Sequence, residues 1–215
     1  ELCKRLVAIE STKENPQGRK QVLDIVKQEL KDFTIEELYD EDTASLLIYN
    51  TKTRPSRFKI IINGHLDVVP ATPEQFTPIL KDGKLLGRGV HDMKGGAAAA
   101  IVVFKEIARI INYPLALQLV TDEEVGGFHG TGYQAKEGIE ADFVLAAEPT
   151  NFVISNKAKG IIWLKAIFHG ATAHSAYLWE GKNAITQAHA FIAMVMQHYP
   201  VPNEEAWRTT VNIAR

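Results

Sequence analysis

Three short apolar runs, separated by segments of helical periodicity, constrain the fold of this chain most strongly. The runs are Phe58–Asn63, Leu115–Val120 and Phe143–Ala147. Each has the length of a strand and lacks polar alternation, which is typical of strands buried on both faces of a sheet. The segment between the first two runs predicts a helix from Gly95 to about Ile111. Its apolar stripe, spaced four and three residues apart in turn, is Ala97, Ile101, Phe104, Ala108 and Ile111. The first 150 residues are therefore expected to form an α/β fold, with a mixed, mostly parallel sheet covered by helices on both faces.

The rest of this region is expected to add shorter elements to the same fold. We predict helices over Glu1–Glu10, Arg19–Lys31 and Tyr133–Lys136, a loop over Asn15–Gly18, strands over Thr34–Tyr39 and Ser45–Asn50, and a hairpin over Leu80–Leu86. The strand at Phe58 is expected to stop at Gly64.

The pattern changes near Asn156. Ile161–Phe168 alternates like a half-exposed strand, Asn183–Tyr199 has helical spacing, and Thr209–Ala214 resembles a second strand. We therefore expect two domains, with residues 1–155 in the first and 156–215 in a smaller, incomplete α+β unit. The chain starts without Met and closes on a strand-like run, so we expect it to be a fragment.

Composition excludes several classes of protein. Hydrophobic residues make up 46% and charged residues 23%, which is ordinary for a globular protein, and the net charge of −2 gives no footprint for nucleic acid or an anionic membrane. The single cysteine, Cys3, excludes a zinc site built on several thiolates. A free thiol and no visible signal peptide favour a cytoplasmic protein.

Histidine and carboxylate side chains follow the predicted strands at their carboxyl ends. His65 and Asp67 follow the first, Glu123 and Glu124 the second, and Glu148 the third, while Asp92 comes just before the predicted helix. Ligand sites of open α/β sheets lie at the carboxyl ends of the strands, so these side chains are expected to converge. Taken singly, each has an ordinary interpretation, such as a helix N-cap for Asp92. Their convergence favours a metal site.

The chemistry of these side chains limits which metal ions could bind and indicates different roles for neighbouring residues. One imidazole and several carboxylates suit zinc, cobalt or manganese. His65 and Asp67 would project to the same side of an extended strand, so Asp67 can accept from the ring nitrogen that does not bind metal. Neighbours Glu123 and Glu124 would point apart in a strand, which favours one as a ligand and the other as a proton acceptor.

Four motifs occur in order along the chain. They are Gly64-His-Leu-Asp-Val-Val-Pro70, Gly87-Arg-Gly-Val-His-Asp-Met-Lys-Gly-Gly96, Asp122-Glu-Glu-Val-Gly-Gly127 and Glu148-Pro149. With them the sequence resembles the zinc metallopeptidase family of aminoacylase, acetylornithine deacetylase, succinyl-diaminopimelate desuccinylase and bacterial glutamate carboxypeptidase. The resemblance implies a zinc-exopeptidase-like catalytic domain with the start of a lid or dimerisation domain.

The resemblance also implies roles for single residues. His65 and Glu148 would bind a first zinc ion, Asp92 would bridge to a second, and Glu124 would bind the second; cobalt could replace zinc. Glu123 would be the general base, and Asp67 would orient His65. A cis peptide bond is implied between Asp92 and Met93.

The second unit carries one further implied residue. Gly170-x-x-x-His174-Ser175 matches the lid histidine of this family, which reaches across a homodimer to stabilise the oxyanion in the partner's site. The family's last ligand of the second metal is a histidine near the C-terminus, after the lid, and no histidine of this chain matches it. The other histidines, among them His129 and His198, are interpreted as structural or surface residues.

Two activities stay open. The first is deacylation of an N-acyl amino acid, and the second is a carboxypeptidase or dipeptidase activity on small peptides. Glu148, where dipeptidases of the family tend to carry Asp, favours a deacylase or carboxypeptidase. A non-catalytic binding relative is the alternative from another class, and the intact motifs argue against it.

Overall fold

The computed structural model describes residues 1–214. The chain divides into two compact units, Glu1–Val153 and Ile154–Arg215. None of the helices in the described part is long and apolar enough to cross a lipid bilayer.

The first unit is built on a five-stranded sheet with the order β1-β2-β6-β3-β7. Its strands are β1 (Thr34–Asp40), β2 (Thr43–Tyr49), β3 (Phe58–His65), β6 (Leu115–Val120) and β7 (Ala141–Ala146). The core strands β6, β3 and β7 are parallel, whereas β1 and β2 are antiparallel to their neighbours. The parallel strands therefore end at one edge of the sheet.

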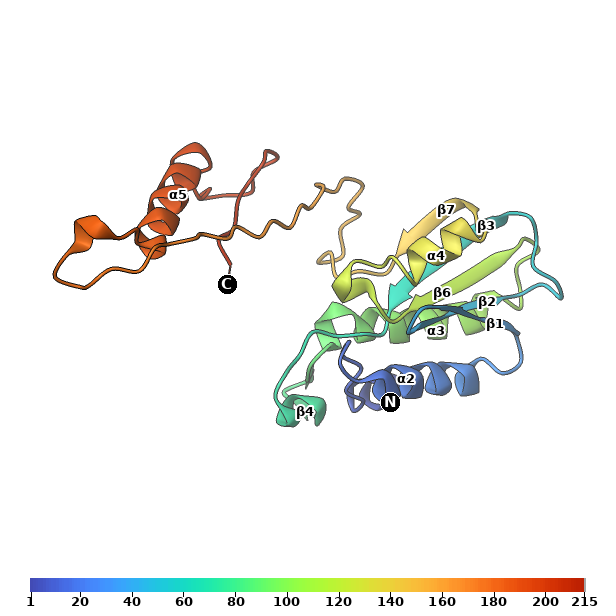
Figure 1. Ribbon diagram of the computed structural model, residues 1–215. Helices are drawn as coiled ribbons and strands as arrows, with labels where there is room; N and C mark the ends of the chain where they lie inside the picture. Colours follow the sequence, from blue (N-terminus) through green and yellow to red (C-terminus); the bar gives the residue numbers. More distant parts are fainter. Residues whose placement is uncertain (215) are drawn as a thin grey trace. The chain divides into compact units, whose positions relative to one another are not determined.

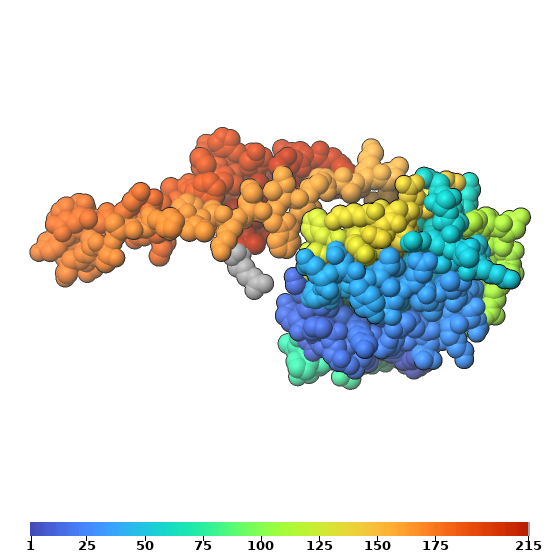
Figure 2. Space-filling model, turned by 45° about the vertical axis from the view of Figure 1, so that its right-hand side comes forward, coloured from blue at the N-terminus to red at the C-terminus, as the bar shows by residue number. Residues whose placement is uncertain are grey.

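Helices cover both faces of this sheet, as predicted. They are α1 (Leu2–Val7), α2 (Pro16–Glu29) and α3 (Gly95–Ile107) on one face and α4 (Thr131–Lys136) on the other (Figure 1). Alternate residues of the strands supply the two cores. Leu46 and Leu117 pack with the first three helices, whereas Leu47 and Ala116 belong to a smaller cluster on the other face. Figure 2 shows the N-terminal residues (blue) gathered on one side of this unit and the α4 region (yellow) on the opposite side.

Several element bounds differ from the predicted ones for local reasons. Helix α2 starts at Pro16, within the predicted loop, because the Asn15 side chain accepts from Gly18 N at 3.0 Å and proline fits the first helical position. Strand β3 continues through Gly64 to His65 because its pairing with β6 extends that far. A small hairpin forms from β4 (Ile79–Lys81) and β5 (Lys84–Leu86).

The prediction that the third apolar run is buried was wrong. Strand β7 lies at the edge of the described sheet and pairs with β3 alone, so its side chains have a neighbouring strand on one side only. Phe143 and Val144 are 60% and 55% exposed. A run of apolar residues does not distinguish an edge strand from a central one.

The second unit contains one long helix, α5 (Ala184–His198). The Asn183 side chain caps it by accepting from Ile185 N at 2.9 Å. The preceding loop is closed by paired backbone hydrogen bonds between Ala171 and Lys182, each 2.9 Å long. The strands predicted at 161–168 and 209–214 are not formed in the described residues. An alternating pattern does not form a strand without a partner strand to pair with.

Candidate metal centre

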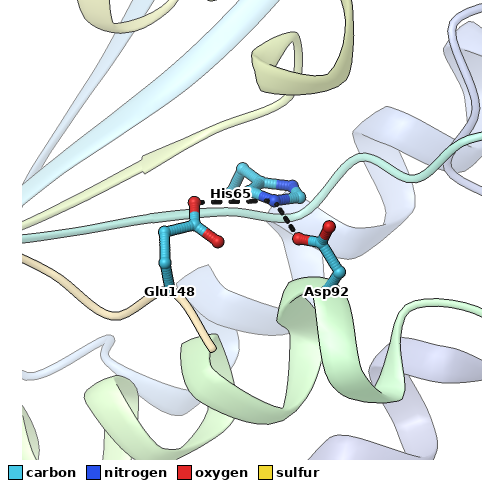
Figure 3. Close-up of side chains that lie close together, drawn as sticks. All are labelled: His65, Asp92 and Glu148. Atoms are coloured by element: carbon cyan, nitrogen blue, oxygen red, sulfur yellow. Dashed lines mark hydrogen bonds and ion pairs between the residues drawn. The ribbon is translucent and has the colours of Figure 1, made fainter. Parts of the chain in front are cut away.

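Three chain segments bring His65, Asp92 and Glu148 together at the carboxyl edge of the sheet. His65 is the last residue of β3, Glu148 follows β7, and Asp92 lies at a kink in the segment Val90–Lys94 before α3. Ala147 N donates to Asn63 O at 2.9 Å, which keeps the chain after β7 alongside β3. Figure 3 shows the three side chains pointing toward one another.

The imidazole of His65 is the centre of this group. Its Nε2 lies 3.1 Å from Asp92 Oδ1 and 3.8 Å from Glu148 Oε1. One ligand atom from each of the three residues lies within 4.8 Å of the other two. The side chain of His65 is 1% exposed and that of Asp92 is 57% exposed, so the group opens to solvent on the Asp92 side. An imidazole with two carboxylates in this arrangement fits zinc.

Asp67 holds two parts of the site at once. The His65 Nδ1 lies 3.0 Å from the main-chain O of Asp67 and 3.5 Å from its Oδ1, so the ring presents Nε2 to the carboxylates. Asp67 Oδ2 accepts from Glu124 N at 3.0 Å. Asp67 therefore orients the imidazole chiefly through its main-chain oxygen, while its side chain fixes the turn that carries Glu123 and Glu124.

The electrostatics of the group favour a cation. Burial lowers the pKa of His65, but the hydrogen bond to Asp67 and the charges of Asp67, Glu148 and Glu123 outweigh it and raise the pKa to about 9. Burial, aided by the charge of Asp92 and opposed by His65, raises the pKa of Glu124 and Glu148. The carboxylates are crowded, and positive charge among them is stabilising.

Glu123 and Glu124 lie in a single 3-10 turn, Glu123–Val125, rather than in the strand assumed from the sequence. Glu123 Oε2 lies 3.8 Å from His65 Nε2, beside the three candidate ligand atoms but not among them. The Glu124 carboxylate is also outside that group. The loop after the turn is held by buried Asp122, whose Oδ2 accepts from His129 N at 2.9 Å and Gly130 N at 3.1 Å.

Asp92 does not cap helix α3. The N-cap position belongs to Lys94, and the Asp92 backbone is not helical. The Asp92–Met93 peptide bond is cis, as the resemblance implies. Two residues that the sequence reasoning passed over follow directly, because Met93 and Lys94 are both fully buried. Burial lowers the pKa of Lys94 to about 7, against the charge of Asp67.

His174 belongs to the second unit and is exposed there. Its Nδ1 accepts a hydrogen bond from Ala176 N at 3.1 Å. A neutral ring that accepts at Nδ1 carries its proton at Nε2. His174 therefore caps a turn, and in its neutral form it presents Nε2–H as a donor.

A family model and several relatives match most of this chain. A model of the peptidase family M20/M25/M40 matches residues 61–213. A probable carboxypeptidase of Aspergillus terreus is 30% identical over 193 residues, covering 82% of this chain and 44% of the relative. A succinyl-diaminopimelate desuccinylase of Variovorax paradoxus is 35% identical over 151 residues, covering 62% of this chain and 38% of the relative. A succinyl-diaminopimelate desuccinylase of Buchnera aphidicola is 32% identical over 196 residues, covering 82% of this chain and 50% of the relative. The chain thus spans half or less of these relatives.

Solved structures agree in fold. The aminopeptidase PepT of Bacillus cereus matches with a TM-score of 0.58 at 22% identity, over 99% of this chain and 59% of that one. Human carnosine dipeptidase 1 matches with a TM-score of 0.54 at 22% identity, over 66% and 36%.

Proposed function

Because this chain belongs to the peptidase family M20/M25/M40, we propose that the protein is a metal-dependent amide hydrolase that removes the acyl group from an N-acyl amino acid. The group formed by His65, Asp92 and Glu148, with Glu123 at its edge, is the observation that carries this proposal. The desuccinylases among its relatives, 30–35% identical, support the deacylase reading.

We propose that His65, Asp92 and Glu148 would hold a first zinc ion, and that Asp92 and Glu124 would hold a second. Bound zinc would polarise the amide carbonyl and lower the pKa of water at the site. Glu123, which is close to this group without being one of its three candidate ligands, accepts the proton of the attacking water. The same carboxyl group then returns the proton to the leaving nitrogen.

We further propose that the protein acts as a homodimer, with no nucleic acid or membrane partner. In this arrangement His174 of one protomer donates through Nε2 to the oxyanion in the partner's site. The hydrogen bond from Ala176 N to Nδ1 supports the role, because it sets the tautomer that this donation needs.

A carboxypeptidase is the second candidate. It is favoured by two relatives called probable carboxypeptidases, 30% and 28% identical to this chain. The same metal group and the same base serve both reactions, since each hydrolyses an amide next to an amino acid carboxylate.

A hydrolysis screen of the intact protein distinguishes the candidates. N-Succinyl-diaminopimelate, N-acetylornithine, a C-terminally free N-blocked dipeptide and an unblocked dipeptide are compared with and without a chelator. We expect chelator-sensitive release of the acyl group from an N-acyl amino acid. Preferential cleavage of the blocked dipeptide would identify a carboxypeptidase instead, and preferential cleavage of the unblocked dipeptide would identify a dipeptidase. No metal-dependent hydrolysis of any substrate would contradict both and leave a binding protein.

A further inference from the structure

Asp92 reaches the metal group from an exposed position. Its side chain is 57% exposed, and the only contact within hydrogen-bonding distance that the described residues give its carboxylate is His65 Nε2. Packing of its own side chain therefore contributes little to its placement. The backbone around it has to be held by its neighbours, and the next two residues, Met93 and Lys94, are fully buried.

Met93 anchors this segment to strand β3. Its Sδ accepts a hydrogen bond from His65 N at 3.2 Å. A Cβ at Gly64 would lie 3.1 Å from the Met93 methyl group, so the glycine leaves room for this contact. The residue after Asp92 is thus in contact with the backbone of the proposed first ligand.

Lys94 anchors the same segment to the N-terminal helix. Its Nζ donates to Leu6 O at 2.9 Å and to Ile9 O at 2.7 Å. Leu6 lies in the last turn of α1 and Ile9 follows the helix by two residues, so both carbonyls are near a helix end, where carbonyl groups carry negative partial charge. A fully buried ammonium group is costly unless its hydrogens are paired, so the two carbonyls hold the lysine at this point.

The same N-terminal segment also holds the chain around Asp67. Ser11 Oγ donates to Leu66 O at 2.6 Å, and Ser11 O accepts from Val68 N at 3.2 Å. The two bonds bracket Asp67 on both sides. Residues 6–11 therefore contact both segments that shape the site: through Lys94 the one with Asp92, and through Ser11 the one with His65 and Asp67.

We propose that Lys94 is a positioning residue of the metal centre, which sets the distance between Asp92 and His65 by tying the Asp92 segment to the end of α1. The inference rests on the proposed function, because it assumes that Asp92 and His65 bind metal. The lysine itself does not touch the metal or the substrate. Its effect should therefore appear in metal affinity and in the geometry of the bound ion.

The test is Lys94→Met in the intact protein, since methionine fills a similar volume and removes the donors. Zinc affinity is measured by competition with a chromophoric chelator, and the coordination geometry by the visible spectrum of the cobalt-loaded protein. Loss of a residue that orients metal ligands typically weakens binding by about 10- to 100-fold, and we expect a loss in that range together with a changed cobalt spectrum.

Arg19→Met is the matched control. Arg19 is also buried, at 4% exposure, and its side chain donates to Asp42 O at 3.2 Å and to Asp42 Oδ2 at 3.0 Å, away from the metal group. It should lower the urea midpoint of unfolding and leave zinc affinity unchanged. Equal losses of zinc affinity in Arg19→Met and Lys94→Met would overturn the inference, because both would then reflect general destabilisation.

Two further variants cover the case in which Lys94→Met does not fold and separate the positioning role from the metal site itself. If Lys94→Met does not fold, Lys94→Gln keeps a hydrogen-bond donor on a side chain too short to hold both Leu6 O and Ile9 O, and zinc affinity as strong as in the unchanged protein would overturn the inference. His65→Ala separates this inference from the proposed function. Loss of zinc in His65→Ala with normal affinity in folded Lys94→Met overturns the positioning role alone, whereas full zinc binding in His65→Ala overturns the metal site itself.

Discussion

Glu123→Gln is expected to retain its metal and to lose turnover by about 100- to 10,000-fold, the usual contribution of general acid–base catalysis. Glutamine keeps the shape of the side chain but does not accept a proton from water. The structure places Glu123 Oε2 3.8 Å from His65 Nε2 and outside the three candidate ligand atoms. The substitution should therefore remove the base and leave the three candidate metal ligands in place.

Glu124→Gln is the contrast for this measurement. It changes the adjacent carboxylate, which we assign to the second ion, and should lower metal content as well as turnover. Metal content by elemental analysis and turnover on the best substrate of the screen are compared for both variants. Near-normal turnover in Glu123→Gln would move the role of base to another carboxylate.

His174→Ala is expected to lower turnover by about 100- to 1,000-fold, as the loss of an oxyanion donor does in other enzymes. Metal content should not change, because His174 is not among the candidate ligands. The physical reason is the loss of the Nε2–H donor, whose tautomer is set by the hydrogen bond from Ala176 N to Nδ1.

Mixing His174→Ala protomers with Glu123→Ala protomers tests whether the histidine acts in the partner's site. In a mixed dimer, the protomer that lacks His174 keeps its own base and receives the intact histidine of its partner. We expect activity to return on mixing. Mixtures as inactive as the separate variants would assign His174 to its own protomer or to the turn that it caps.

The grouping of His65, Asp92 and Glu148 could be predicted from the sequence because the placement of these residues depends on local features. Each proposed ligand on the sheet follows an apolar run of strand length, and parallel strands present their carboxyl ends at one edge. Asp92 was located by the motif that precedes α3. The predictions that failed concern pairing between distant segments. The exposure of β7 and the unformed strands at 161–168 and 209–214 depend on which segments lie alongside them, and the sequence pattern of one segment does not contain that information.

The supporting residues were missed for a related reason. Lys94 and Asp122 are charged, and charged residues are mostly exposed, so nothing in the pattern marked them as buried. Their partners are backbone groups, Leu6 O and Ile9 O for Lys94, and His129 N and Gly130 N for Asp122. Backbone partners leave no trace in the residue types of a sequence. A lysine two residues after an expected metal ligand, next to two glycines, was the one available signal.

The most direct test of the account is the zinc content of the purified intact protein compared with its His65→Ala and His198→Ala variants. His198 bonds to Met194 O within α5 and serves as the matched histidine control. We predict that His65→Ala loses the first ion, because its Nε2 is the point on which Asp92 and Glu148 converge, whereas His198→Ala keeps the zinc content of the unchanged protein. Full zinc content in a folded His65→Ala variant would contradict the assignment of the metal centre.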